Sequence, residues 1–211
     1  MTRSTTDDLW EAMSTARAIR RYRDEPVDQA VIDRCLEAAT WAPSGGNQQP
    51  WRFVEIRSPK LRTIIGEGGR ESWEIMTEFY GLSVPDPDDQ HPRARTVRTM
   101  HDYMIGAATV PVCFLFCVQP QRGASPLEQG GSIFPAMQNF LLAARAQGLG
   151  ASVALWHRSK EDQLRPLIGI PDDWLIASTV TAGWPVGHHG PLKRKPVADA
   201  SCVDLWSANV P

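Results

Sequence analysis

The chain has 211 residues, 42% of them hydrophobic, which predicts one compact domain over residues 1–211 with a substantial core. Lys and Arg number 22 against 24 Asp and Glu, and this net charge of -2 argues against a nucleic-acid-binding or membrane-surface protein. The N-terminus has no signal-like run, and no stretch reaches the roughly 18 apolar residues of a membrane span, so we expect a cytoplasmic protein.

The first quarter of the chain alternates helical and irregular segments. Residues 7–16 predict a helix that leads directly into the basic cluster RAIRRY, residues 17–22. A second helix is expected from about Asp28, because the apolar residues after it recur with a period near 3.6. The segment WAPSGGNQQP, residues 41–50, is rich in Gly, Pro and Asn and predicts an ordered loop. Residues 51–56, WRFVEI, alternate as a half-buried strand does.

The middle of the chain contains the least regular pattern and the most hydrophobic strand. Residues 61–80 are ambiguous and predict a helix only in part. Residues 81–95 carry three prolines and many charges, which indicates an exposed excursion before helical spacing returns over 96–108. VPVCFLFCV, residues 110–118, is a continuous run of β-favouring apolar residues and predicts a strand buried on both faces.

The remaining elements are predicted from caps and apolar runs. A polar loop precedes an expected helix over 132–146, with Ser132 as its N-cap. Residues 151–156 and 175–183 predict two further strands. Between them, Ser159 followed by Asp162 resembles a capping box for a short helix.

Neither the cysteines nor the histidine pair of this sequence predicts a metal site. Reduced structural thiols are expected, because no cysteine belongs to a CxxC pair; the cysteines are Cys35, Cys113, Cys117 and Cys202. His188 and His189 lie between glycines and predict an exposed turn. The tail over 192–211 is too apolar to lie free in solvent.

Three segments are suited to a flavin mononucleotide. The guanidinium groups of residues 17–22 and the cations of residues 193–195 could bind a phosphate dianion, although both could be solvated surface charge. APSGGNQQPW, residues 42–51, combines a flexible glycine pair with the amide of Asn47, or forms a simple helix-to-strand connection. GLGASVALW, residues 148–156, could present backbone N–H groups to a flavin, or simply cap a helix and start a core strand.

Taken in order, these segments resemble the nitroreductase family. GxGxxG, P-loop, HExxH and GxSxG motifs are absent, which removes the common nucleotide-binding and hydrolase mechanisms. The resemblance is carried by RAIRRY, APSGGNQQPWRF, FPAMQNFLLAARAQGLG, LRPLIGIPDDW and AGWPVGHHGPLKRKP. It covers nearly the whole chain and is weak between about Leu61 and Val110.

The resemblance implies an α+β fold in which helices flank a central mixed β-sheet, and an intertwined homodimer with FMN at the interface. Arg17, the backbone of Ala18 and Arg20 would hold the phosphate and ribityl end, joined by Arg194 at the phosphate. The partner subunit would contribute Pro43, Ser44, Gly45 and Asn47, and the backbone around Val153, Leu155 and Trp156 would face the ring. Ala18 replaces a hydroxyl residue that is frequent in the family, which removes one side-chain hydrogen bond.

The implied activity is transfer of reducing equivalents from NAD(P)H to a small organic acceptor, such as a nitroaromatic or a quinone, in a ping-pong reaction. Alternatives within the same fold are a reductive dehalogenase, an enoyl reductase or a flavin-fragmenting enzyme. A flavin-binding protein without turnover is the alternative from another class. Neither a general acid nor a ring contact between residues 61 and 110 is singled out by the resemblance.

Overall fold

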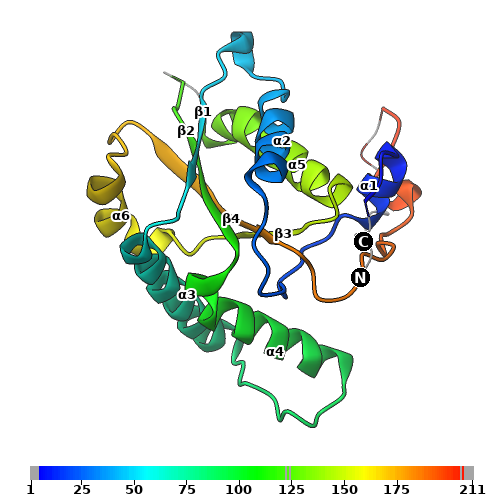
Figure 1. Cartoon of the computed structure of the whole chain (residues 1–211). Coiled ribbons are helices and arrows are strands. Elements are labelled where there is room, and N and C mark those ends of the chain that lie inside the picture. The colour runs from blue at the N-terminus through cyan, green and yellow to red at the C-terminus, as the bar shows by residue number, and fades with distance from the viewer. Residues whose placement is uncertain (1–4, 122, 124, 205, 207–211) are drawn as a thin grey trace.

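The computed structural model describes residues 5–121, 123, 125–204 and 206 of the chain (Figure 1). A four-stranded sheet at the centre is flanked by helices on both faces. Its strands are β1 Trp51–Glu55, β2 Val112–Val118, β3 Gly150–Ala154 and β4 Leu175–Gly183. The helices are α1 Leu9–Thr15, α2 Gln29–Thr40, α3 Pro59–Tyr80, α4 Pro92–Ile105, α5 Pro126–Ala146 and α6 Glu161–Ile168.

The strands follow the order β1-β2-β4-β3, and every described ladder between them is antiparallel. The sheet was predicted to be mixed, but in the described residues it is antiparallel. β2 and β3 run in the same direction, but β4 lies between them and runs in the opposite direction. Among the described residues, parallel pairing is limited to an isolated bridge between Ala18 and Ala151 at the edge of β3.

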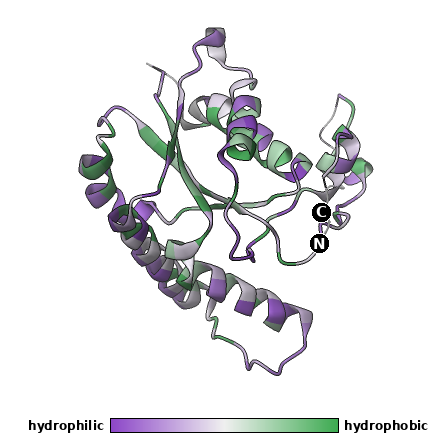
Figure 2. Ribbon diagram, viewed as in Figure 1, coloured by the Kyte–Doolittle hydropathy of each residue, from purple (hydrophilic) through white to green (hydrophobic). Residues whose placement is uncertain are grey.

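Each face of the sheet packs against its own layer of helices, and Figure 2 shows the hydrophobic residues concentrated along the strands. On one face, Phe114 and Phe116 of β2 pack with Phe140 of α5 in a cluster that also includes buried residues of α2. On the other face, Leu115 packs in a cluster with residues of α3, α4 and α6, including Ile65. All seven residues of β2 are buried, which confirms the strand predicted from its apolar run.

One predicted helix start and one predicted capping box were wrong, although the short helix after Ser159 is present as α6. The helix expected from Ser132 begins at Pro126, because Ser125 and Glu128 form a capping box in which the Ser125 hydroxyl accepts from the Glu128 N–H. Ser132 is buried inside this helix. Ser159 caps nothing either: it lies in a 3₁₀ turn, and α6 begins at Glu161 without a side-chain cap.

The ambiguous segment after residue 60 is a continuous helix of 22 residues, α3. Its glycines allow it to cross neighbouring backbone at close range. A Cβ added at Gly68 would lie 1.9 Å from the carbonyl oxygen of Trp156, and one at Gly69 would lie 2.3 Å from that of Met104. Because real Cβ atoms do not approach so closely, Gly68 is needed where α3 meets the segment that follows β3, and Gly69 is needed where α3 crosses α4.

His157 predicts a pH dependence of stability. Burial lowers the pKa of His157 to about 4, and its Nδ1 lies 3.0 Å from the Thr179 hydroxyl. An unfolded histidine titrates near pH 6.5, so the unfolded chain binds more protons between about pH 6.5 and about pH 4. We expect the free energy of unfolding to fall over this window by up to about 3 kcal/mol as pH decreases.

The expected loss is measured by urea unfolding across that pH window. The variant His157→Gln keeps a polar group opposite Thr179 but does not titrate there. Its free energy of unfolding should therefore depend less steeply on pH than that of the wild type. Identical slopes for the two proteins would show that another group controls stability in acid.

Candidate functional site

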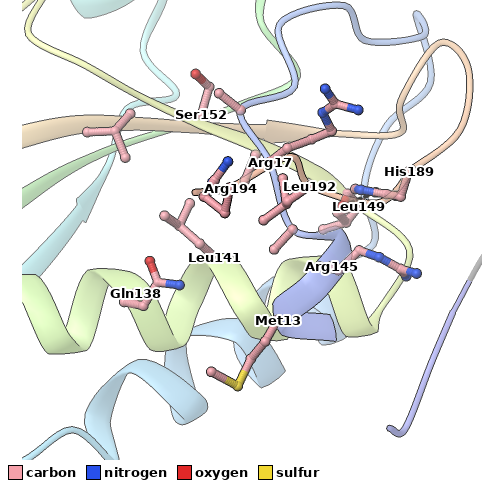
Figure 3. A pocket seen from close by; sticks show the side chains of 14 residues that line it. Met13, Arg17, Gln138, Leu141, Arg145, Leu149, Ser152, His189, Leu192 and Arg194 are labelled. Atoms are coloured by element: carbon pink, nitrogen blue, oxygen red, sulfur yellow. Dashed lines mark hydrogen bonds between the residues drawn. The ribbon is translucent and has the colours of Figure 1, made fainter. Parts of the chain in front are cut away.

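A pocket of about 430 Å³ lies where the segment after α1, the helix α5, the strand β3 and the loop at residues 189–194 meet (Figure 3). It brings together residues from both ends of the chain. Its lining consists of Met13, Ala16, Arg17, Ala18, Gln138, Leu141, Arg145, Leu149, Ala151, Ser152, Val153, His189, Leu192 and Arg194. Four residues proposed from the sequence, Arg17, Ala18, Val153 and Arg194, are thus gathered in one place. We call it the phosphate pocket.

Backbone hydrogen bonds hold the two basic segments at this pocket. The N–H of Ile19 donates to the Ala151 carbonyl at 2.9 Å, which fastens the RAIRRY segment to the edge of β3. The N–H of Leu192 donates to the Ser14 carbonyl at 2.9 Å, which brings the C-terminal basic segment to the end of α1. A Cβ at Gly150 would lie 2.4 Å from Ile19 Cγ2, so a glycine is needed where the segments cross.

The pocket has a positive charge that the protein leaves partly uncompensated. Arg145 is buried, and its guanidinium donates to Glu11 at 2.9 Å and to the Thr15 hydroxyl at 2.7 Å. Arg194 donates to the Lys193 carbonyl and faces no carboxylate within the described part of the chain. The Arg17 guanidinium has no hydrogen bond or ion pair to any described residue. Two guanidinium groups are therefore available to an anion, with the geometry that phosphate oxygens accept.

His189 was predicted to lie in an exposed turn, and this was wrong. Its ring is partly buried in the wall of the phosphate pocket, and Nε2 lies 3.1 Å from the Leu149 carbonyl oxygen, to which it donates. Burial, followed by the nearby charge of Arg145, lowers the pKa of His189. The buried Nδ1 has no hydrogen-bond partner in the described structure. A buried ring nitrogen without a partner is expected where a ligand completes the site.

A second pocket, of about 560 Å³, adjoins the first at Val153. It is mainly apolar, and we call it the apolar pocket. One wall consists of Val153, Ala154, Leu155 and Trp156, and Arg20 lies at this pocket rather than at the phosphate pocket. The opposite wall comes from α3 and α4 and includes Ser72, Ile75, Met76, Phe79, Tyr80, Met100, Tyr103 and Met104. A flat apolar ring could lie between these walls.

The loop APSGGNQQP lies away from both pockets of its own chain. In Figure 1 the 3₁₀ turn Gly45–Asn47 projects beyond the ends of α2 and β1, far from α1. Its backbone is tightly wound, with positive φ at Gly46, Asn47 and Gln49, and the Ser44 hydroxyl accepts from the Gln49 N–H at 2.9 Å. Neither Pro43 nor any neighbour in this loop lines the phosphate pocket, so within one chain the structure does not unite them with Arg17.

Sequence reasoning missed several residues that line the pockets. Gln138 and His189 line the phosphate pocket, and the α3 residues Ile75 and Phe79 line the apolar pocket. The α3 residues carried a usable signal. The signal is the pair of adjacent aromatics, Phe79 and Tyr80, just before Gly81. The structure shows that both side chains are strongly exposed, as is expected of a binding surface.

The chain is similar to known proteins in both sequence and fold. The sequence model of the Nitroreductase family matches residues 13–184. A protein from Archaeoglobus fulgidus, assigned as an NADH dehydrogenase/NAD(P)H nitroreductase, is 30% identical over 183 residues, or 85% of this chain and 86% of that protein. The 5,6-dimethylbenzimidazole synthase of Rhodobacter capsulatus is 29% identical over 85% of this chain and 84% of the synthase. A solved structure from Desulfovibrio desulfuricans, assigned as a nitroreductase in complex with FMN, superimposes with a TM-score of 0.65 at 25% identity, covering 96% of this chain and 100% of that one.

Proposed function

The chain belongs to the nitroreductase family, and on this basis we propose that it is an FMN-dependent oxidoreductase that uses NAD(P)H to reduce a small organic acceptor. The nitroreductase-like α+β fold expected from the sequence is confirmed. The observation that carries the proposal is the junction of the two pockets at Val153: a phosphate pocket with unpaired guanidinium groups continues into an apolar pocket. FMN has matching parts in the same order, because its ribityl chain joins a phosphate to a flat ring.

The residues of the two pockets fit the parts of FMN. Arg17 and Arg194 would bind the phosphate. The unpartnered Nδ1 of His189 would accept a hydrogen bond from a ribityl hydroxyl, because Nε2 carries the ring proton that is donated to the Leu149 carbonyl. The ribityl chain would pass the backbone of Ala18, and the ring would lie against Val153, Leu155 and the Trp156 backbone, with Arg20 beside it. We further propose a homodimer in which Pro43, Ser44, Gly45 and Asn47 of the partner subunit complete the site.

The protein's own contribution is binding, charge and exclusion of water. When bound, FMN would supply the two-electron chemistry that links NAD(P)H to the acceptor. Arg20 would stabilise negative charge on the reduced ring, because a cation in a poorly solvated site acts strongly on nearby charge. The apolar walls contributed by α3 and α4 would keep water away from the transferred hydride.

Acceptor-dependent oxidation of NAD(P)H tests the proposed activity. Purified protein loaded with FMN should oxidise NAD(P)H slowly alone, and faster with increasing nitroarene or quinone. Initial rates at several fixed acceptor concentrations should give the parallel double-reciprocal lines of a ping-pong reaction. If no acceptor in a panel raises the rate although the flavin is bound, the protein is a flavin binder rather than this kind of enzyme.

A specialised flavin enzyme is the second candidate, and one relative favours it. The Rhodobacter capsulatus relative is named as a synthase rather than a reductase, although its identity to this chain is similar to that of the Archaeoglobus fulgidus relative. The two candidates differ in the fate of the flavin. For an NAD(P)H-dependent reductase, the visible flavin band should return fully when oxygen reoxidises the reduced protein. Permanent loss of the band, with new products by mass spectrometry, would favour a flavin-fragmenting enzyme.

A further inference from the structure

A third cleft, of about 590 Å³, lies between the RAIRRY segment and α4. We call it the arginine cleft. Its lining consists of Arg17, Arg20, Arg21, Pro92, Arg95, Thr96, Arg98, Thr99 and Asp102. Five guanidinium groups thus surround one space in a chain whose net charge is -2. The arrangement creates a local positive field that the overall composition does not indicate.

Internal ion pairs do not neutralise this charge. The sole carboxylate in the lining belongs to Asp102, whose Oδ1 lies 3.0 Å from His101 Nδ1. Arg98 is held in place by the backbone, because its guanidinium donates to the carbonyl oxygens of Asp86 and Asp89. Within the described chain, the guanidinium groups of the other four arginines of the cleft have no hydrogen bond or ion pair to the protein. Like charges held close together without partners favour binding of a polyanion.

The arginine cleft adjoins both pockets of the proposed flavin site. Arg17 also lines the phosphate pocket, and Arg20 also lines the apolar pocket. A ligand whose ring occupies the apolar pocket could therefore extend past Arg20 into the cleft. The remaining lining residues are mainly polar or charged and include no aromatic side chain, so the cleft suits phosphate groups rather than a base or ring.

We propose that the arginine cleft binds the phosphate groups of the nicotinamide donor, and that this donor is NADPH rather than NADH. The inference rests on the proposed function, because it assumes that a nicotinamide occupies the apolar pocket. Both nucleotides carry a diphosphate, and NADPH adds a 2′-phosphate monoester with close to two negative charges at neutral pH. Three arginines line the cleft without lining the phosphate pocket or the apolar pocket, and Arg98 is one of them. Because the Arg98 guanidinium already donates to two backbone carbonyl oxygens, Arg21 and Arg95 are the specificity residues.

Calorimetric titration of the FMN-loaded protein with NADP⁺ and with NAD⁺ tests the assignment directly. The wild type should bind NADP⁺ at least about tenfold more tightly than NAD⁺, since one charge-assisted hydrogen bond changes affinity about ten- to hundredfold. Arg95→Ala and Arg21→Ala should each weaken NADP⁺ binding by about that factor and NAD⁺ binding much less. The matched control is Arg93→Ala, which removes an exposed arginine of the same helix that does not line the cleft.

Three results would overturn the assignment. Equal affinities for the two nucleotides in the wild type would reject NADPH as the preferred donor. Equal losses for both nucleotides in the Arg21 and Arg95 variants would place the shared diphosphate in the cleft and would show that these arginines do not select NADPH. No change in either variant would show that the cleft does not bind the donor.

Anaerobic reduction separates this inference from the proposed function. If neither NADH nor NADPH bleaches the wild-type flavin while dithionite does, the proposed function fails, and the cleft assignment fails with it. If both nucleotides bleach the flavin equally and the variants behave as the wild type, the proposed function stands and the cleft assignment alone fails. Bleaching by NADPH that slows in Arg95→Ala, but not in Arg93→Ala, supports both.

Discussion

Replacing both Arg17 and Arg194 by alanine is expected to raise the dissociation constant of FMN about a hundred- to ten-thousandfold. Each guanidinium would form a charge-assisted hydrogen bond to the phosphate that contributes roughly 1.5 to 3 kcal/mol, so each single variant should lose about ten- to hundredfold. The free energy of unfolding of the apoprotein should change little, because both side chains are exposed and neither is part of an ion pair in the described structure. Fluorescence titration of the apoprotein at fixed ionic strength measures the affinity.

Lys193→Ala is the matched control for this pair. Lys193 is an exposed cation beside Arg194, but it does not line the phosphate pocket, so its loss should leave FMN affinity nearly unchanged. Arg23, which lies just outside the RAIRRY segment, is unsuitable as a control because its Nε donates to the Pro185 carbonyl at 3.1 Å. Equal affinities for the wild type, Lys193→Ala and the double variant would remove both arginines from the site.

Trp10→Asp is expected to dissociate the proposed homodimer and to release FMN at the same time. Leu9, Trp10 and Met13 form an exposed apolar stripe on α1, with Trp10 78% exposed, and Met13 also lines the phosphate pocket. A partner subunit that covered this stripe would therefore also cover the flavin site. A central interface tryptophan typically contributes 2 kcal/mol or more, so the dimer dissociation constant should rise at least about thirtyfold.

Sedimentation velocity at micromolar protein, together with the bound flavin content, measures both effects. Val84→Asp is the control, because it places the same charge at an exposed apolar residue in the loop before α4, away from α1. The control should remain dimeric and yellow. A wild-type protein that is monomeric with FMN bound, or a Trp10→Asp protein that keeps both dimer and flavin, would contradict the proposed assembly.

The sequence predicted best those elements whose signal is local. The apolar run at 110–118 corresponds to β2, because a strand buried on both faces needs continuous apolar residues. The segment at 175–183 corresponds to β4. Helix starts were predicted less well, since several possible caps compete. α5 begins after Ser125 and not after Ser132, because Pro126 and Glu128 complete the cap at Ser125. The strand order could not be derived, because the position of β4 between β2 and β3 depends on long-range pairing.

In the candidate site too, residues with a local sequence signal were predicted, and residues placed by tertiary packing were missed. Arg17 and Arg194 could be proposed together from the sequence because each stands in a recognisable basic segment, and the structure places both at the phosphate pocket. His189 was missed because glycines flank it, and its burial depends on packing against Leu149. The arginine cleft was missed as well, because Arg95 reaches the RAIRRY segment only through the tertiary packing of α4.

Binding of one FMN per chain through the phosphate pocket is tested by the visible spectrum of the purified protein together with the mass of its released cofactor. We predict a yellow protein that releases one FMN per chain, because the two basic segments form a single phosphate pocket and no dinucleotide fingerprint is present. Release of FAD, or a protein that stays colourless after incubation with excess FMN, would contradict the account.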